Sequence, residues 1–336
     1  LQANPDVSLR GARDVIFTRK GELGGGVRYY VLAISSESEQ KIYLINGRYF
    51  LIENLLDVKS YLPNAYPTIL CGNGDDSNNE IMFGINDGNG NSGNYGFASI
   101  RNFFIREGNV PGAYDKIVLG QRKVYDRGYT SYMGIFIDNT HEITYVIREG
   151  TSRYSSGERF VGKQVVNTVF VNQEGAIVFV ATAKNDPQQI SIHRTGVQAS
   201  WESDQIKFDA DPYEYADTVE PSLTTDSKMV ANVKYDYVFY SQGNKLYRWV
   251  YMALEPKLPS EPELVLDDPD DEITCMEMSS DQEHLWMCVY NKNATTALKG
   301  KLLVVNPVTM QIEKTIEGIS DRALKMMWKP ITFHGD

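Results

Sequence analysis

Cysteine is scarce in this chain, whose 336 residues include only Cys71, Cys275 and Cys288. Three cysteines are too few for a disulfide framework, and their spacing does not match a zinc ribbon. Long apolar runs are absent too, because no stretch of about 18 apolar residues occurs, and this excludes a membrane-spanning helix. A buried apolar core must therefore stabilise the fold.

Basic residues are outnumbered, since 33 Lys and Arg stand against 44 Asp and Glu, for a formal net charge of −11. Binding to phosphate groups needs a basic face, so the charge argues against nucleic acid and against an anionic membrane surface as partners. The hydrophobic fraction of 42% is ordinary for a globular protein. The excess of acidic residues is interpreted as a source of solubility.

Common catalytic motifs are also missing. The four histidines are scattered, and there is no His-Glu-x-x-His run, no Gly-x-Ser-x-Gly elbow and no glycine-rich phosphate loop. The segment from Asp281 to Trp286 matches only the tail of the aspartate box of sialidase propellers, because Glu283 stands where that motif has Gly. The acidic run at 267–272 precedes a strand, and such runs are usually solvated.

Short polar turns recur along the chain, each followed by a strand that carries an aromatic residue. These aromatic residues are Tyr43, Tyr145, Phe179, Tyr247 and Trp286, which lie 102, 34, 68 and 39 residues apart. A unit of ~34–50 residues fits if the long gaps hide diverged copies, and strand repeats of that length are typical of β-propellers. The sequence therefore predicts an all-β propeller of about seven four-stranded blades, with six and eight left open.

Two predicted blades can be outlined strand by strand. The N-terminal strands are expected at 15–17, 29–34, 41–45 and 48–52, with a tight hairpin turn at Asn46-Gly47. The C-terminal strands are expected at 275–278, 285–290, 300–305 and 311–316. An open ring leaves unpaired sheet edges, so we expect another strand at 322–329, of which 323–327 meets the N-terminal blade.

Two segments of this single predicted domain, residues 71–96 and 202–228, are expected to be long inserted loops. The first is dense in Gly, Asn and Asp, and the second is rich in Asp, Glu, Pro and Tyr without alternation. Long loops on a rigid scaffold often carry function. Decoration of the propeller rim is the alternative interpretation.

The first of these segments contains a candidate calcium site. Asp87, Asn89 and Asn91 place oxygen-bearing side chains at alternate positions, as in the front half of a calcium loop. Ser92 and Ala98 stand where the EF-hand pattern requires Gly and Glu. Calcium at these three residues is one interpretation, and a turn cluster without metal is the other. We expect no other cofactor.

Aromatic residues are plentiful, with 21 Tyr, 13 Phe and 4 Trp. In a propeller most of them pack between blades, but Tyr and Trp also offer flat faces with a polar edge to sugars and to protein partners. The candidate exposed patch lies near Arg122, where aromatic and basic residues alternate. Its predicted ligand-binding residues are Tyr125, Arg127, Tyr129 and Tyr132.

The last predicted blade places two cysteines opposite each other. A turn centred on Asp281 and Gln282 leaves six residues back to Cys275 and six forward to Cys288. Direct cross-strand partners have Cβ atoms ~4.5–5.5 Å apart, wider than the ~3.8 Å of a relaxed disulfide. We therefore expect neighbouring reduced thiols that pack as small apolar groups between blades, and no redox site.

The C-terminal pattern supports a family resemblance. It consists of Ser279-Ser280-Asp281, the strands at 285–290 and 300–305, and Glu313 to Gly318, and it resembles the last blade of the PKD-like family of surface lipoproteins. Residues 134–139 with 143–147 resemble a mid-propeller hairpin of that family. The resemblance covers most of the chain in layout and is specific in motifs for its last ~50 residues.

The resemblance implies a protein of a Gram-negative gut anaerobe with no catalytic residues, and we expect a monomer. Such a protein is held at the outer-membrane surface by a lipidated N-terminus and takes part in binding or assembly beside a glycan or peptide uptake system. This chain starts at Leu1 without a signal peptide or lipobox Cys, so we expect a mature or trimmed chain. The expected partner is a protein or glycan. The alternative is a glycoside hydrolase or lyase that uses carboxylates in a central cleft.

Overall fold

The computed structural model confirms the predicted all-β class, because its described residues form 24 strands and a single short helix. No described helix is long and apolar enough to cross a membrane. The structure describes residues 11–20, 29–47, 51–72, 80–88, 92–100, 103–107, 116–124, 129–148, 161–171, 176–183, 186–200, 205–208, 213–218, 227–250, 259–279 and 281–327. The chain divides into two compact units, which are described separately.

The first unit comprises residues 1–161, 197–208 and 329–336. Its first antiparallel meander is β1 (Ala12–Lys20), β2 (Tyr29–Ser36), β3 (Lys41–Asn46) and β4 (Ile52–Asp57), followed by helix α1 (Val58–Tyr61). The second is β5 (Tyr66–Gly72), β6 (Glu80–Asn86), β7 (Ser92–Ser99) and β8 (Ile105–Glu107). A third sheet contains β9 (Lys116–Val124), β10 (Tyr129–Asp138) and β11 (Ile143–Arg148).

The second unit comprises residues 162–196 and 209–328. Its first sheet is built on β12 (Lys163–Phe170), β13 (Ala176–Ala183) and β14 (Asp186–Ser200). The unit boundary falls within β14: its residues 189–194 pair with β16 (Tyr213–Thr218) in the second unit, and its residues 197–200 belong to the first unit and pair there with β15 (Gln205–Phe208). Two meanders follow: β17 (Met229–Asn232), β18 (Tyr237–Gln242), β19 (Lys245–Val250) and β20 (Leu264–Val265), then β21 (Asp271–Met278), β22 (Leu285–Asn291), β23 (Gly300–Val305) and β24 (Ile312–Ser320).

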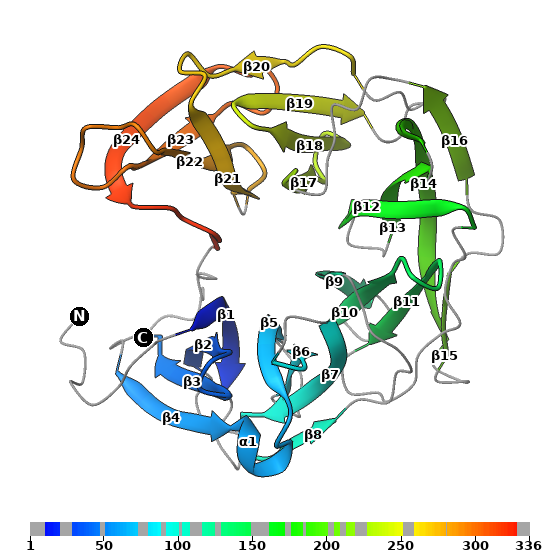
Figure 1. The fold of residues 1–336 in the computed structure, drawn as a ribbon, viewed down its shortest axis with the longest axis vertical. Coiled ribbons are helices and arrows are strands. Elements are labelled where there is room, and N and C mark those ends of the chain that lie inside the picture. The colour runs from blue at the N-terminus through cyan, green and yellow to red at the C-terminus, as the bar shows by residue number, and fades with distance from the viewer. Residues whose placement is uncertain are drawn as a thin grey trace. The chain divides into compact units, whose positions relative to one another are not determined.

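Four of these sheets are regular four-stranded meanders, which is the form of a propeller blade (Figure 1). The described residues form six sheets in all, four of them four-stranded, so the expected seven blades are wrong. The fold class itself is the predicted β-propeller. Within a meander, each strand pairs with the strand that follows it in the chain.

The wrong count has a cause in the sequence repeat. Tyr43, Tyr145 and Tyr247 all lie on the third strand of their sheets, β3, β11 and β19. They are 102 residues apart (145 − 43 and 247 − 145), and each interval contains one further sheet, which gives about 51 residues per blade. Phe179 and Trp286 lie on second strands, β13 and β22. Mixing second and third strands therefore shortened the apparent period.

The recurring polar turns have a common construction. A Ser, Asp or Asn that ends one strand or immediately follows it is succeeded, four residues on, by a residue with positive φ; the pairs are Ser36 and Gln40, Asp138 and Glu142, Asn232 and Asp236, and Asn306 and Met310. In the last pair the Asn306 side-chain oxygen accepts hydrogen bonds from the amides of Val308 and Thr309, both at 3.0 Å. Asn and Asp favour such turns because their side chains bond the backbone two residues on. Two of these turns, those before Tyr43 and Tyr145, belong to the repeat seen in the sequence, whereas the turn before Tyr247 is a different one with positive φ at Gly243.

The last blade agrees with its predicted strands, but several other predictions are wrong. The fourth N-terminal strand was expected at 48–52, of which 48–50 lie outside the described residues, and the observed fourth strand is β4, Ile52–Asp57. The Asn46 amide donates to the Leu51 carbonyl at 2.8 Å. The described residues 321–327 form no strand, so the expected closing strand is absent there.

Where the structure describes them, the two expected loops contain strands. Within 71–96, the chain forms β6 and most of β7, where Met82 and Tyr95 are buried. Within 202–228 it forms β15 and β16, and most of the remaining residues of that segment lie outside the described part of the chain. Glycine misled the first prediction: Gly96 is a strand residue at which a Cβ would lie 2.3 Å from the Phe83 ring, so the position needs glycine for packing.

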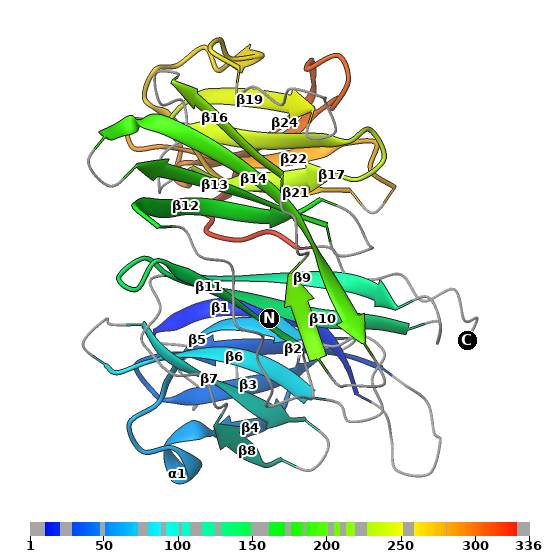
Figure 2. The same ribbon diagram turned by 90° about the vertical axis from the view of Figure 1, so that its right-hand side faces the viewer.

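Adjacent sheets of the first unit are joined by a buried aspartate. Asp14 on β1 accepts a hydrogen bond from the Leu70 amide on β5 at 2.8 Å, and β1 and β5 lie side by side in Figures 1 and 2. Ser35 on β2 donates to the Thr68 carbonyl. In the second unit, Asn167 on β12 donates to the Ser227 carbonyl at 2.9 Å, just before β17. A polar residue on a first strand thus bonds the next blade in both units.

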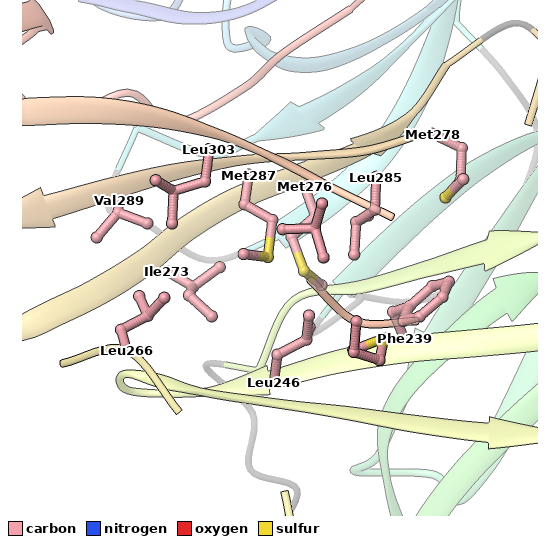
Figure 3. Packing of buried hydrophobic residues seen from close by; sticks show 12 residues of the cluster. Phe239, Leu246, Leu266, Ile273, Met276, Met278, Leu285, Met287, Val289 and Leu303 are labelled. Carbon is pink, nitrogen blue, oxygen red and sulfur yellow. The ribbon is translucent and has the colours of Figure 1, made fainter. Parts of the chain in front are cut away.

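The largest core described in the second unit lies between its last two meanders (Figure 3). Alternate residues of β21 and β22 point into it, as expected for strands with one face against a neighbouring sheet. Its fully buried members include Phe239, Leu246, Leu285 and Met287. Methionine is frequent here, because its unbranched side chain fills irregular gaps.

Candidate binding surface

The predicted ligand-binding residues are only partly placed. Tyr129 and Tyr132 lie on β10, where their Cα partners on β9 are Val124 and Gln121. Tyr125 and Arg127 lie outside the described residues. The expected patch therefore stays a prediction.

The candidate calcium site is described at one residue. Asp87 directly follows β6 and is exposed, whereas Asn89 and Asn91 lie outside the described residues. Gly88 has φ +80°, its amide donates to the Asn86 side chain at 2.8 Å, and a Cβ here would lie 2.7 Å from the Tyr66 ring. Turn geometry and close packing explain this glycine without a metal. The described residues contain no group of three His, Cys, Asp or Glu that could hold one.

A different aromatic–basic cluster occurs in the second unit, at the junction of its last two meanders. We call Lys234, Tyr235, Tyr237 and Arg248 the Tyr235 patch. The two tyrosine rings stack with centroids 5.9 Å apart and 30° between their planes. The Lys234 ammonium lies 5.1 Å from the centroid of the Tyr235 ring, and the Arg248 guanidinium 4.8 Å from that of Tyr237. Cations so placed are attracted by the ring quadrupole.

Each cation of the Tyr235 patch is paired with a carboxylate. Lys234 pairs with Glu283, and Arg248 pairs with Glu263 at 3.1 Å. The Tyr235 hydroxyl also donates to Glu283 at 3.0 Å. These hydrogen bonds lower the pKa of Glu283 and keep it ionised. The patch consequently combines aromatic edges with balanced charge.

The Tyr235 patch is anchored to the neighbouring blade. Arg248 on β19 donates to the carbonyls of Pro307 and Val308, at 2.9 and 2.6 Å, in the β23–β24 turn. The buried Asn232 donates to the Gln282 carbonyl at 2.8 Å, and the Gln282 side chain accepts from the Val233 amide at 3.0 Å. Two hairpin turns fifty residues apart are thereby locked together, so the patch is rigid.

Part of this patch could have been predicted from the sequence, although the repeat of turns and strands did not indicate it. Lys234-Tyr235-Asp236-Tyr237 interleaves charged and aromatic residues in a polar turn, as the region near Arg122 does. That Arg248 belongs to the patch could not be predicted, because only the pairing of Phe239 with Arg248 brings β19 beside this turn.

The opposite face of the β21–β22 hairpin carries the titratable groups. We call Cys275, Glu277, Trp286 and Cys288 the Glu277 face, since they alternate with the core residues and pair as Cys275 with Cys288 and Glu277 with Trp286. Burial raises the pKa of Glu277 to about 7, although the Met278 amide and the charge of Lys325 oppose the rise. Lys325 belongs to the segment that follows β24.

The predicted cysteine register is confirmed. Cys275 and Cys288 are direct Cα partners, and both are buried free thiols. The bulge between Ile273 and Cys275 leaves Thr274 without a partner residue, and its hydroxyl donates to the Cys288 carbonyl at 3.3 Å.

Comparison with solved structures supports the fold. The chain is similar to the β-propeller domain of Cps50 (Swd1) from Myceliophteria thermophila, with 8% identity and a TM-score of 0.53 over 94% of this chain and 88% of that one. It is also similar to a functionally unknown protein from Desulfotomaculum acetoxidans, with 10% identity and a TM-score of 0.52 over 93% and 87%.

A third match is to the dihydro-heme d1 dehydrogenase NirN in complex with DHE, with 12% identity and a TM-score of 0.49. It covers 85% of this chain, which spans 55% of that protein's length, and a score of this size carries no argument. No protein-family model and no curated protein matches the chain. The comparisons thus show a β-propeller fold and no family.

Proposed function

We propose that this chain is a non-catalytic binding protein of the outer-membrane surface that takes part in nutrient uptake. The location is proposed from the C-terminal resemblance to PKD-like surface lipoproteins. The binding role is proposed from the Tyr235 patch, where stacked tyrosines and paired charges are held rigid between two blades. A rigid patch with aromatic anchors loses little conformational entropy on binding.

The balanced charge of the patch favours a neutral glycan as the ligand. Lys234 and Arg248 are already paired with carboxylates, so an anionic ligand would have to displace Glu283 or Glu263. A sugar instead offers hydroxyl groups to these donors and acceptors and apolar C–H faces to the tyrosines. A peptide is the competing ligand and forms the second arm of the test.

The proposal is tested by screening the purified chain on glycan and peptide arrays and measuring Kd for each hit by calorimetry. Tyr235→Ala should weaken binding of a neutral glycan at least tenfold, whereas Tyr235→Phe should retain most of it, because ring contact supplies the affinity. Tyr61→Ala, at a half-exposed tyrosine on α1, is the matched control and should change nothing. Equal losses at Tyr61 and Tyr235, or binding of peptides alone, would contradict the proposal.

A hydrolase or lyase is the second candidate, and the elevated pKa of Glu277 is the observation that favours it. A general acid needs such a pKa, and a second carboxylate ~5–9 Å away completes the pair. Glu272 is five residues earlier on β21, about 16 Å along the strand, so this pair does not match the requirement. Release of reducing ends from an array glycan, abolished by Glu277→Gln, would favour the enzyme.

A further inference from the structure

The cysteine pair lies where chemistry between its two sulfurs is geometrically direct. Cys275 and Cys288 are Cα partners on adjacent antiparallel strands, so their side chains leave the same face of the hairpin as direct neighbours. Both are buried free thiols. The expectation of two inert thiols rested on the Cβ spacing alone.

The surroundings of the pair favour one thiolate. The neighbouring Cys275 thiol lowers the pKa of Cys288, against the effect of burial. The neighbouring Cys288 sulfur, together with burial, raises the pKa of Cys275, and the positive charge of Lys228 opposes that rise. A thiolate beside a thiol that donates to it is the usual arrangement of a reactive dithiol.

The pair lies on the Glu277 face, away from the apolar core. The core residues of the hairpin, such as Met287, are the alternate residues of the same strands. In the described part of the second unit, two segments come near this face: the one before β17, through Lys228 near Cys275, and the one after β24, through Lys325 near Glu277 and Arg322, which pairs with Glu272. Both cysteines are buried, so a small oxidant reaches the sulfurs through a local opening of the fold.

We propose that Cys275 and Cys288 are a redox-responsive dithiol that a hydroperoxide closes to a disulfide across the β21–β22 hairpin. The Cys288 thiolate attacks one peroxide oxygen, the O–O bond breaks, and the departing hydroxide takes up the proton that Cys288 released to solvent on ionisation, which gives water and a sulfenic acid. The Cys275 sulfur then attacks the Cys288 sulfur, the S–O bond breaks, and a second water leaves with the Cys275 proton. Two thiols are oxidised by two electrons, and the peroxide is reduced to two waters.

The test exposes the native chain to hydrogen peroxide and then counts thiols under denaturing, non-reducing conditions. The count should fall from three to one, the mass should fall by about 2 Da, and dithiothreitol should restore three thiols. Peptide mapping should find the peptides of Cys275 and Cys288 joined. Cys71→Ser should also lose two thiols, which shows that the third cysteine is not involved.

Single variants identify the attacking sulfur. In Cys275→Ser, Cys288 should accumulate a sulfenic acid that dimedone traps, whereas in Cys288→Ser the remaining Cys275 should react at least tenfold more slowly, because burial still raises its pKa. If these variants fail to fold, the peptide map of the unaltered chain still decides the matter. Retention of three thiols by the native chain, when the urea-unfolded chain loses them, would overturn the proposal, as would a bond to Cys71.

Discussion

The two faces of the β21–β22 hairpin consist of alternate residues of the same strands, yet they differ in chemistry. One face supplies Met276, Leu285 and Met287 to the core shared with β18 and β19 (Figure 3). The Glu277 face holds a carboxyl group with raised pKa, a thiol pair and an indole. The first face packs against a sheet, and the second is approached by a chain segment that bears Arg322 and Lys325.

This difference shows which side chains can be buried against a sheet and which can be buried against an irregular segment. A sheet of alternating apolar residues can bury only apolar partners without leaving polar groups unsatisfied. An irregular segment supplies charges and is held by few contacts, so titratable groups can lie beneath it. Stability should therefore depend on packing for the core face and on pH and oxidation for the Glu277 face.

Truncation of the core face should have the largest effect. Leu285 is fully buried in the core, so Leu285→Ala should lower the free energy of unfolding by about 4 kcal/mol, because it removes apolar contacts and leaves a cavity. Urea denaturation measures the loss. Leu324→Ala is the control and should change the free energy by less than about 0.5 kcal/mol, since Leu324 is exposed. Similar losses of free energy in both variants would show that stability does not depend on packing of the core face.

The Glu277 face should instead respond to pH. Because the folded pKa of Glu277, about 7, lies above its ordinary value of 4.5, the protonated carboxyl supports folding fully below about pH 4.5, and that support is lost as the pH rises through 7. Glu277→Gln should therefore match the parent at pH 4 and exceed it by about 2–3 kcal/mol at pH 8. Melting curves at the two pH values test this. A constant difference at both values would show that Glu277 does not titrate as inferred.

The hydrogen bond between the last two meanders, from Asn232 to Gln282, allows a test of how much contacts between blades stabilise the fold. Asn232 is fully buried and bonds the next blade, so Asn232→Ala should cost about 2 kcal/mol, because the Gln282 carbonyl loses its donor. Asn306 caps a turn of the same kind but bonds within its own hairpin and is only partly buried, so Asn306→Ala should cost about 1 kcal/mol. Urea midpoints compare them. An equal cost would mean that the bond between blades adds nothing.

Removing the ion pair of the segment near the Glu277 face should have the smallest effect on the free energy of unfolding. The ion pair of Arg322 with Glu272 is solvent-exposed, so Arg322→Ala should change the free energy of unfolding by under about 0.5 kcal/mol, and the effect should vanish in 1 M salt. Amide exchange of residues 321–327 should nevertheless accelerate in the variant. Unchanged exchange would show that the ion pair does not hold the segment.

The last blade was predicted correctly strand by strand, and so was the pairing of its cysteines. Both depend on local information: alternation with a period of two, and a turn whose centre sets the register. The N-terminal blade was predicted less well, because its fourth strand is Ile52–Asp57 and the Asn46 amide bonds the Leu51 carbonyl, a pairing that the dipeptide Asn46-Gly47 did not indicate. The blade count failed since the aromatic residues that set the period lie on third strands in three sheets and on second strands in two.

The Tyr235 patch shows how much of the candidate site could not be predicted from the sequence. Its tyrosines were visible in a polar turn, but Arg248 and Glu283 reach them from another strand and another blade. Local residue order determined the class of fold, the alternation of faces and the turns, because these depend on interactions between neighbours in the chain. Which turns meet, which charges pair and which carboxyl group has its pKa raised were decided by the tertiary structure, since burial and contacts between blades arise only when distant strands pack.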